Sequence, residues 1–172
     1  MSRRHNMFRF VVAAILLVFA SAERKTTCPP GYDKVDNFCF KLLSEKLSLF
    51  EATTACDVID GKVVEVTSQD EQTRVSQYLS KVAGTSPSDM HVWLGATDLQ
   101  VEGTFLYMSH SNEQAIASFS NWAPSHPSKD ADSNCVSLSY TAGWAWEDVP
   151  CTYHIPVLCY VHLELEQDGI VG

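Results

Sequence analysis

The chain has 172 residues, 45% of them hydrophobic, and a formal net charge of −9. This length suits one compact domain with a core of its own, and the acidic balance makes nucleic acid, heparin-like chains and anionic membranes poor partners. No feature singles out a pair of glycosidase carboxylates, and no Gly-x-Ser-x-Gly motif occurs. We therefore expect that the protein is not an enzyme.

The first 22 residues have the composition of a secretory signal peptide. Three arginines precede an apolar run over residues 10–20, which is well short of the roughly 20 residues that a membrane span needs. Small residues at 20–22 match a cleavage site. We expect a secreted chain without a membrane span, in which nine basic residues face 21 acidic ones for a net charge of −12.

All six cysteines follow this leader, at Cys28, Cys39, Cys56, Cys135, Cys151 and Cys159. An even count on the oxidising secretory route indicates disulfide bonds, although spacing alone leaves the pairing open. No Cys-x2-Cys pair occurs, so a zinc site is not indicated. With every cysteine paired inside the chain, any oligomer would be non-covalent.

The predicted elements begin with a hairpin over residues 29–42, where turn residues separate alternating apolar ones. A helix follows. Ser48 with Glu51 three residues later forms a capping box, and Gly61 is a natural helix stop.

A short strand is predicted at 63–66. A second capping box, Ser68 with Glu71, then opens a helix that runs to about Val82. Beyond it the pattern changes to short β segments separated by irregular stretches, including a long loop at 109–134 that is typical of a functional surface. These segments are predicted at 91–98, 104–108, 135–140, 144–148 and 157–161. The order of elements indicates an α+β fold.

Five motifs resemble the C-type lectin-like family in order and spacing: VWLGATD at 92–98, FSNWAP at 119–124, NCV at 134–136, WED at 146–148 and CTYHIPVLCY at 151–160. The resemblance covers about residues 28–161. It implies two helices, small antiparallel sheets and a long loop region stapled by disulfides. We expect a signal peptide at 1–22, a C-type lectin-like domain at 23–162 and a short acidic tail at 163–172.

The resemblance also implies one disulfide pairing. It joins Cys56 to Cys159, Cys135 to Cys151, and Cys28 to Cys39, the last being the extra bridge of the family's long form.

Sugar-binding members of the family hold a calcium ion with a Glu-Pro-Asn or Gln-Pro-Asp triplet around a proline that is usually cis. A further acid and a Trp-Asn-Asp motif complete the site, since calcium takes about six to eight oxygen ligands. The corresponding residues here are His126, Pro127, Ser128, Ser133, Glu147 and Asp148. Imidazole is a poor calcium ligand and a serine hydroxyl is neutral, so the primary site reads as degraded.

The loop between the proline triplet and Cys135 is about one residue shorter than in typical sugar-binding members. If this difference shifts the alignment of the loop residues with the family's ligands, a calcium ion remains possible. Asp130 and Asp132 would then join Ser128, Glu147 and Asp148 as metal ligands.

Asp98 and Glu102 match the spacing of an auxiliary calcium site in the family. Lys129 falls where that site needs another acid, so hydrogen bonds within a turn are the favoured role for this pair.

The resemblance implies recognition of a glycan or glycoprotein, in an innate-defence setting, through the loop at 109–134 together with 144–148. The candidate ligand-binding residues are His126, Pro127, Ser128, Trp144, Glu147 and Asp148. Trp93 and Trp122 are expected in the core, and Trp144 is the tryptophan expected nearer the surface, although packing is its favoured role. The alternative is a calcium-independent member that binds a protein, or a mineral or ice surface.

Overall fold

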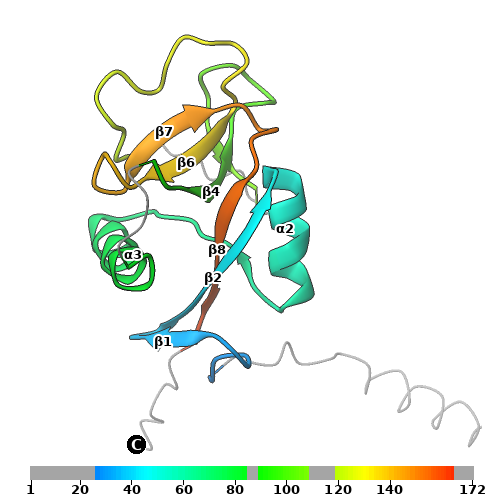
Figure 1. The fold of residues 1–172 in the computed structure, drawn as a ribbon, viewed down its shortest axis with the longest axis vertical. Coiled ribbons are helices and arrows are strands. Elements are labelled where there is room, and N and C mark those ends of the chain that lie inside the picture. Colours follow the sequence, from blue (N-terminus) through cyan, green and yellow to red (C-terminus); the bar gives the residue numbers. More distant parts are fainter. Residues whose placement is uncertain (1–25, 85–88, 109–118, 165–172) are drawn as a thin grey trace, which may run out of the picture.

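The computed structural model describes residues 26–84, 89–108 and 119–164, which fold into two helices around one mixed sheet (Figure 1). The α+β fold class expected from the sequence is confirmed. In chain order the elements are β1 (Asp33–Val35), β2 (Phe38–Leu47), α2 (Leu49–Val58), β3 (Lys62–Val63), α3 (Gln69–Val82), β4 (His91–Thr97), β5 (Leu106–Tyr107), β6 (Cys135–Ser139), β7 (Ala145–Val149) and β8 (Ile155–His162).

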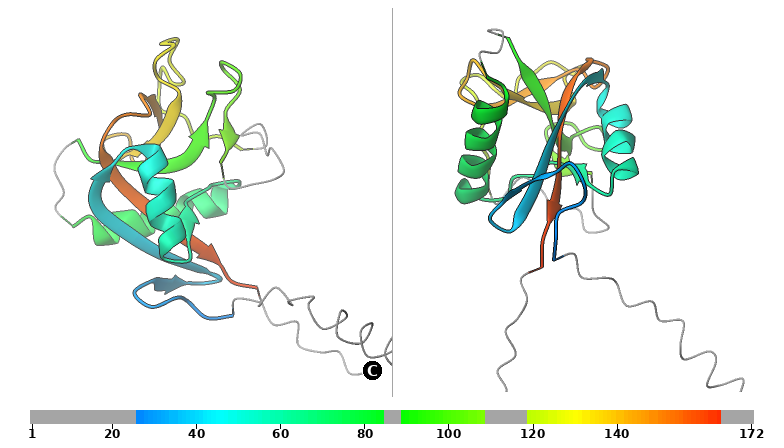
Figure 2. Two further views of the ribbon diagram at one scale, coloured as in Figure 1. Left: turned by 90° about the vertical axis from the view of Figure 1, so that its right-hand side faces the viewer. Right: turned by 60° about the horizontal axis from the view of Figure 1, so that its bottom comes forward.

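The strands follow the order β1-β2-β8-β4-β6-β7, with β3 beside β8 and β5 beside β4. All pairs are antiparallel except β4 and β8, which meet in parallel at Trp93 and Val157. The long pair β2 and β8 runs down the molecule, with α2 and α3 on opposite sides of it (Figure 2). Strands β6 and β7 carry the 119–134 loop at the top in Figure 1. The loop is therefore at the opposite end from the start of β2 and the end of β8.

Helix α2 begins where the sequence predicts it. Ser48 Oγ accepts a hydrogen bond from the Glu51 N–H, and the Glu51 carboxylate accepts one from the Ser48 N–H at 2.9 Å. The helix ends before Gly61, and Asp60 takes the left-handed conformation that often follows a helix, at φ 62°. Gly61 is needed for a different reason, because a Cβ atom there would lie 2.1 Å from the Tyr32 hydroxyl oxygen.

Helix α3 begins at the second predicted cap, with one difference. Ser68 Oγ accepts a hydrogen bond from the Glu71 N–H at 3.3 Å. The Glu71 carboxylate instead accepts from the Thr67 N–H at 2.7 Å and from the Thr67 hydroxyl at 2.9 Å. The reciprocal half of this capping box was wrongly predicted, because the residue before the cap brings two donors to the same oxygen. The helix ends at Val82, as expected.

The core fills both faces of the sheet, which explains why β4 reads as a nearly continuous apolar run. Trp93 and Trp146 are fully buried, and the Trp93 indole N–H donates to the Leu47 carbonyl at 2.7 Å. The strand predicted at 63–66 is reduced to β3, although its later valines stay buried.

Three disulfides join the pairs that the resemblance implies. Cys56–Cys159 ties α2 to β8, Cys135–Cys151 ties β6 to the segment after β7, and Cys28–Cys39 ties the N-terminal segment to β2. The predicted pairing is confirmed.

Some expectations concern residues outside the described ranges. The signal peptide at 1–22, the loop residues 109–118 and most of the tail at 163–172 are among them, so the domain boundaries stay predictions. Among the residues that the structure describes, no helix combines the length and apolar character needed to cross a membrane.

Candidate ligand-binding site

The described part of the long loop, residues 119–134, packs along β7. The Ala123 N–H donates to the Trp146 carbonyl and the Trp146 N–H donates to the Asn121 carbonyl, both at 2.8 Å. The half-buried Trp122 ring lies edge-on against Trp146, with ring centroids 5.7 Å apart. These contacts anchor the loop to the strand that carries the last two predicted calcium ligands.

Beyond this anchor, Asp148 holds the residues of the proline triplet. Its Oδ1 accepts from the Ser128 N–H at 2.8 Å and lies 2.5 Å from His126 Nδ1, while its Oδ2 accepts from the Ser128 hydroxyl at 2.6 Å. The Asp148 side chain is 2% exposed. The peptide bond between His126 and Pro127 is cis. We call His126, Ser128 and Asp148 the loop clasp.

The loop clasp holds a charged carboxylate. Burial alone would raise the pKa of Asp148, but the hydrogen bonds from Ser128 and His126 outweigh burial and hold that pKa below its ordinary value. Asp148 is therefore ionised at neutral pH, and each of its oxygens already accepts from a proton donor.

Glu147 does not join the clasp. Successive strand residues face opposite sides of a sheet, and the Glu147 carboxylate lies 3.9 Å from His91 Nδ1, which is 3.1 Å from Ser137 Oγ. The two predicted acids thus do not converge on one point. In the three described stretches of chain, no group of three His, Cys, Asp or Glu side chains is placed to hold a metal ion.

The profile of the lectin C-type domain family matches residues 45–161 of this chain. The chain belongs to the C-type lectin domain family. This is a family of binding domains rather than of enzymes.

The sequence is 26% identical over 148 residues to C-type mannose receptor 2 of Homo sapiens, covering 85% of this chain and 9% of that protein. The chain therefore spans less than a tenth of the length of this relative. Human lithostathine has a similar structure, with a TM-score of 0.68, 24% identity, and coverage of 80% of this chain and 92% of that chain. A calcium-independent type II antifreeze protein has a TM-score of 0.65 and 18% identity, with coverage of 80% and 96%. These similarities describe the fold.

In a C-type lectin domain that binds calcium, the positions of the loop clasp supply ligands to the ion. Here His126 would offer a nitrogen and Ser128 a neutral hydroxyl, which suit a hard cation poorly. Both side chains are also hydrogen-bonded to Asp148. The residues present do not fit calcium at this position.

The acids expected to replace these ligands have other contacts. Asp130 and Asp132 are both exposed, and Asp130 Oδ1 accepts from the Asp132 N–H at 3.1 Å. The Asp130 N–H in turn contacts Ser128 Oγ at 3.2 Å. Asp130 thus shapes the turn after the clasp, and neither acid lies in a metal-holding group among the described residues.

Asp98 is 3% exposed and stabilises its own turn, since its Oδ2 accepts from the Gly103 N–H at 2.8 Å. Its Oδ1 is buried and has no hydrogen-bond partner among the described residues. Glu102 and Lys129 are exposed. The turn contact agrees with the role that the sequence favoured for Asp98.

Trp144 is 2% exposed, and its indole N–H donates to Ser80 Oγ on α3 at 2.9 Å. This burial agrees with the packing role that the sequence favoured for Trp144, and not with a place nearer the surface. The ring is covered because α3 packs against the turn that precedes β7, so Trp144 is not part of the accessible site.

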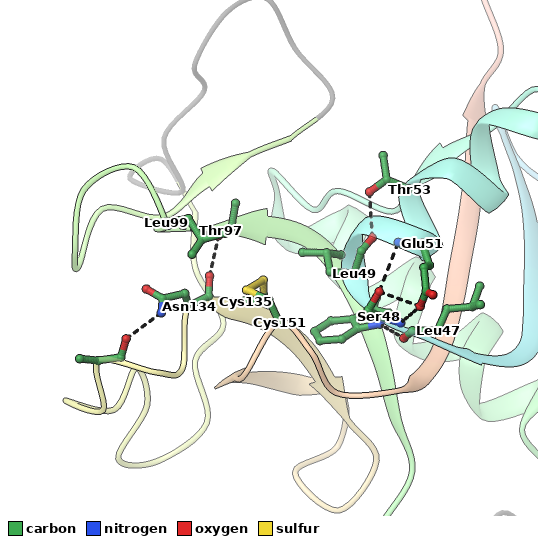
Figure 3. The surroundings of a disulfide bond; sticks show 12 residues. Leu47, Ser48, Leu49, Glu51, Thr53, Thr97, Leu99, Asn134, Cys135 and Cys151 are labelled. Atoms are coloured by element: carbon green, nitrogen blue, oxygen red, sulfur yellow. Dashed lines mark hydrogen bonds between the residues drawn. A yellow bond between two sulfur atoms is a disulfide. The ribbon is translucent and has the colours of Figure 1, made fainter.

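The base of the loop is held next to the start of α2 (Figure 3). Thr97 Oγ1 donates to the Asn134 carbonyl at 2.6 Å, and Asn134 donates to the Ala131 carbonyl at 2.7 Å. Cys135 follows directly and is bonded to Cys151, whose carbonyl accepts from the Leu49 N–H. The loop is thus fixed at its base and at its clasp.

The sequence did not reveal that Asp148 holds the loop as an acceptor. The available signal was a change of chemistry, because His126 and Ser128 put proton donors where a calcium site has acceptors.

Proposed function

We propose that this chain is a secreted recognition module that binds its ligand without calcium, through the face formed by residues 119–134 and β7. The observation that carries this proposal is the state of Asp148. Its Oδ1 accepts from His126 and from the Ser128 N–H, and its Oδ2 accepts from the Ser128 hydroxyl, at 2.5–2.8 Å, so the loop has its shape without an ion.

A calcium ion would have to displace these contacts. Each hydrogen bond to a charged group contributes about 1.5–3 kcal/mol, and the replacement ligands from His126 and Ser128 are weak. The calcium-dependent mode of sugar binding implied by the family resemblance is therefore disfavoured for this chain.

The ligand class that the family favours is a glycan or glycoprotein. The face offers exposed polar side chains, among them Ser125, Lys129, Asp130 and Asp132, which can contact sugar hydroxyls directly. The cow CD23 domain was solved in the presence of an oligosaccharide, and its 24% identity to this chain supports a shared fold only.

A second candidate ligand is a protein or an ordered solid surface. Leu99 is 52% exposed and Val101 is 59% exposed. Both follow Asp98, whose N–H donates to the Asn134 carbonyl at the base of the loop. This places two exposed apolar side chains beside the base of the loop, where a protein or a solid surface can contact them.

Calcium titration by calorimetry, with melting in calcium and in chelator, tests the proposal. We expect no heat and no shift in melting temperature. A bound ion at a hundredfold excess over its dissociation constant would add about 2.7 kcal/mol of stability. A clear heat with a raised melting temperature would overturn calcium independence.

A restored variant provides the matched positive control. Combining His126→Glu, Ser128→Asn and Ser133→Glu removes the imidazole and hydroxyl donors of the clasp and supplies oxygen ligands of the kind that the family uses. We expect this variant, unlike the native chain, to bind calcium in the same titration.

A glycan array in calcium and in chelator then separates the ligand classes. Equal binding in both buffers supports calcium-independent glycan recognition. An array that stays blank in both would exclude a glycan ligand and favour the protein or surface candidate.

A further inference from the structure

Residues from the start of β2, the end of β8 and the segment after α2 line a cleft, which we call the lower cleft. The start of β2 and the end of β8 lie at the bottom in Figure 1, at the opposite end from the 119–134 loop. The volume of the cleft is about 480 Å³, which is within the range of small-ligand sites. The aromatic and charged side chains in its lining include Phe38, Asp60, Lys62, Glu65, Glu71 and Tyr160.

Two aromatic rings form the apolar part of the cleft. The Phe38 and Tyr160 centroids lie 6.4 Å apart, and the His162 ring lies 4.8 Å from Phe38. Phe38 already contacts a cation, because the Arg74 guanidinium lies 5.2 Å from its ring centroid and is paired with Asp36 at 2.9 Å. Arg74 already supplies the cation at this ring, so Phe38 offers the cleft an apolar contact.

The polar part of the cleft is mainly acidic. Asp60, Glu65 and Glu71 bring three carboxylates against the single ammonium of Lys62. Glu65 is 8% exposed, and the Tyr160 hydroxyl donates to it at 3.4 Å. The acidic lining is thus partly withdrawn from water, where charges act more strongly.

Two tyrosines lie close enough to the carboxylates of the cleft for their pKa values to be affected. Burial, followed by the charges of Glu65 and Glu71, raises the pKa of Tyr160 well above its ordinary value. Burial likewise raises the pKa of Tyr107, with the same two carboxylates adding to the shift.

We propose that the lower cleft binds an alkyl chain that ends in a cation, the side chain of a lysine or arginine on a partner polypeptide. Its methylene groups would lie against Phe38 and Tyr160, and its charged end would meet Glu65 and Glu71. The site is independent of the loop clasp, so the domain would have two separate binding faces.

Amide chemical-shift mapping on the disulfide-bonded protein tests this inference. The probes are N-acetyl-lysine N-methylamide, n-butylammonium and, as the uncharged control, N-acetyl-norleucine N-methylamide, all at millimolar concentrations. We expect saturable shifts at residues 60–67 and 160–162 with the lysine compound and none with norleucine. Equal binding of n-butylammonium would support the cation site and point to a free amine as a source of the same group.

Matched charge variants complete the test. We expect Glu65→Gln to weaken binding of the lysine compound by about tenfold, and Glu45→Gln, which removes an exposed acid of β2 outside the cleft, to leave it unchanged. The inference would be overturned by equal shifts with norleucine, by shifts confined to other residues, or by no shifts in the native protein. These readings need no calcium or sugar, so they are independent of the proposed function.

Discussion

At the scale of single residues, Asp148 decides how the long loop is held. In the loop clasp a buried carboxylate accepts three hydrogen bonds from residues 20 and 22 positions earlier in the chain. Proton donors thus take the place that a cation has in calcium-binding relatives. A loop held in this way keeps its shape whether or not calcium is present.

We expect Asp148→Asn to lower the free energy of unfolding by about 2 kcal/mol, because an amide accepts through one oxygen only and leaves a buried donor without a partner. Denaturant unfolding measures this. Asp132→Asn is the matched control, since its exposed carboxylate should change stability by no more than about 0.5 kcal/mol. Equal effects of the two substitutions would contradict the clasp.

Comparing the native protein with Asp148→Asn at different pH values gives a further test. The pKa of Asp148 is lower in the folded chain than its ordinary value, so its contribution is complete above the unfolded pKa of about 3.9. The contribution is lost as pH falls through the lower folded pKa. The stability difference between native protein and Asp148→Asn should therefore shrink below about pH 4. A difference that grows in acid would contradict this linkage.

Position 61 requires glycine because of a neighbouring side chain, and not because of its own backbone conformation. A Cβ atom there would lie 2.1 Å from the Tyr32 hydroxyl oxygen, which is buried and has no hydrogen-bond partner among the described residues. We expect Gly61→Ala to cost about 2 kcal/mol of stability. Adding Tyr32→Phe should recover about half of that loss, and a double variant no more stable than Gly61→Ala would refute the clash.

At the scale of elements, the helix starts show how far local chemistry reaches. Ser48 and Glu51 bond to each other in both directions, so α2 is capped by residues of its own first turn. At α3 the carboxylate of the equivalent residue, Glu71, accepts hydrogen bonds from Thr67 instead of from the N-cap residue. Both helices nevertheless begin where the sequence predicts.

We expect Ser48→Ala to destabilise the protein by about 1 kcal/mol, the usual effect of losing an N-cap. Ser44→Ala on the exposed part of β2 is the control and should stay within about 0.5 kcal/mol. Chemical denaturation compares them. A cap variant as stable as the control would show that α2 is positioned by packing alone.

At the scale of the whole molecule, the disulfides connect parts of very different separation. Cys56–Cys159 spans 103 residues and ties the first helix to the last strand, whereas Cys135–Cys151 spans 16. The two bridges therefore constrain the unfolded chain to different degrees.

Chain entropy predicts a loss of about 4.7 kcal/mol when a bridge closing about 100 residues is removed, against about 3 kcal/mol for one closing about 15. We therefore expect the double variant Cys56→Ala, Cys159→Ala to melt at a lower temperature than Cys135→Ala, Cys151→Ala. The opposite order would mean that native packing around the shorter bridge matters more than loop length.

The α+β class, both helix starts and most strands follow from local patterns in the amino-acid sequence, because caps and alternating side chains act over a few neighbouring residues. The disulfide pairing followed from family resemblance, since spacing does not choose among pairings. The remaining features depend on contacts between distant parts of the chain. The Trp144 indole N–H donates to Ser80, 64 residues away. Asp148 takes its donors from residues 126 and 128 of the loop, and several separate segments line the lower cleft. Such contacts depend on which distant segments pack together, and no local pattern of residues encodes them.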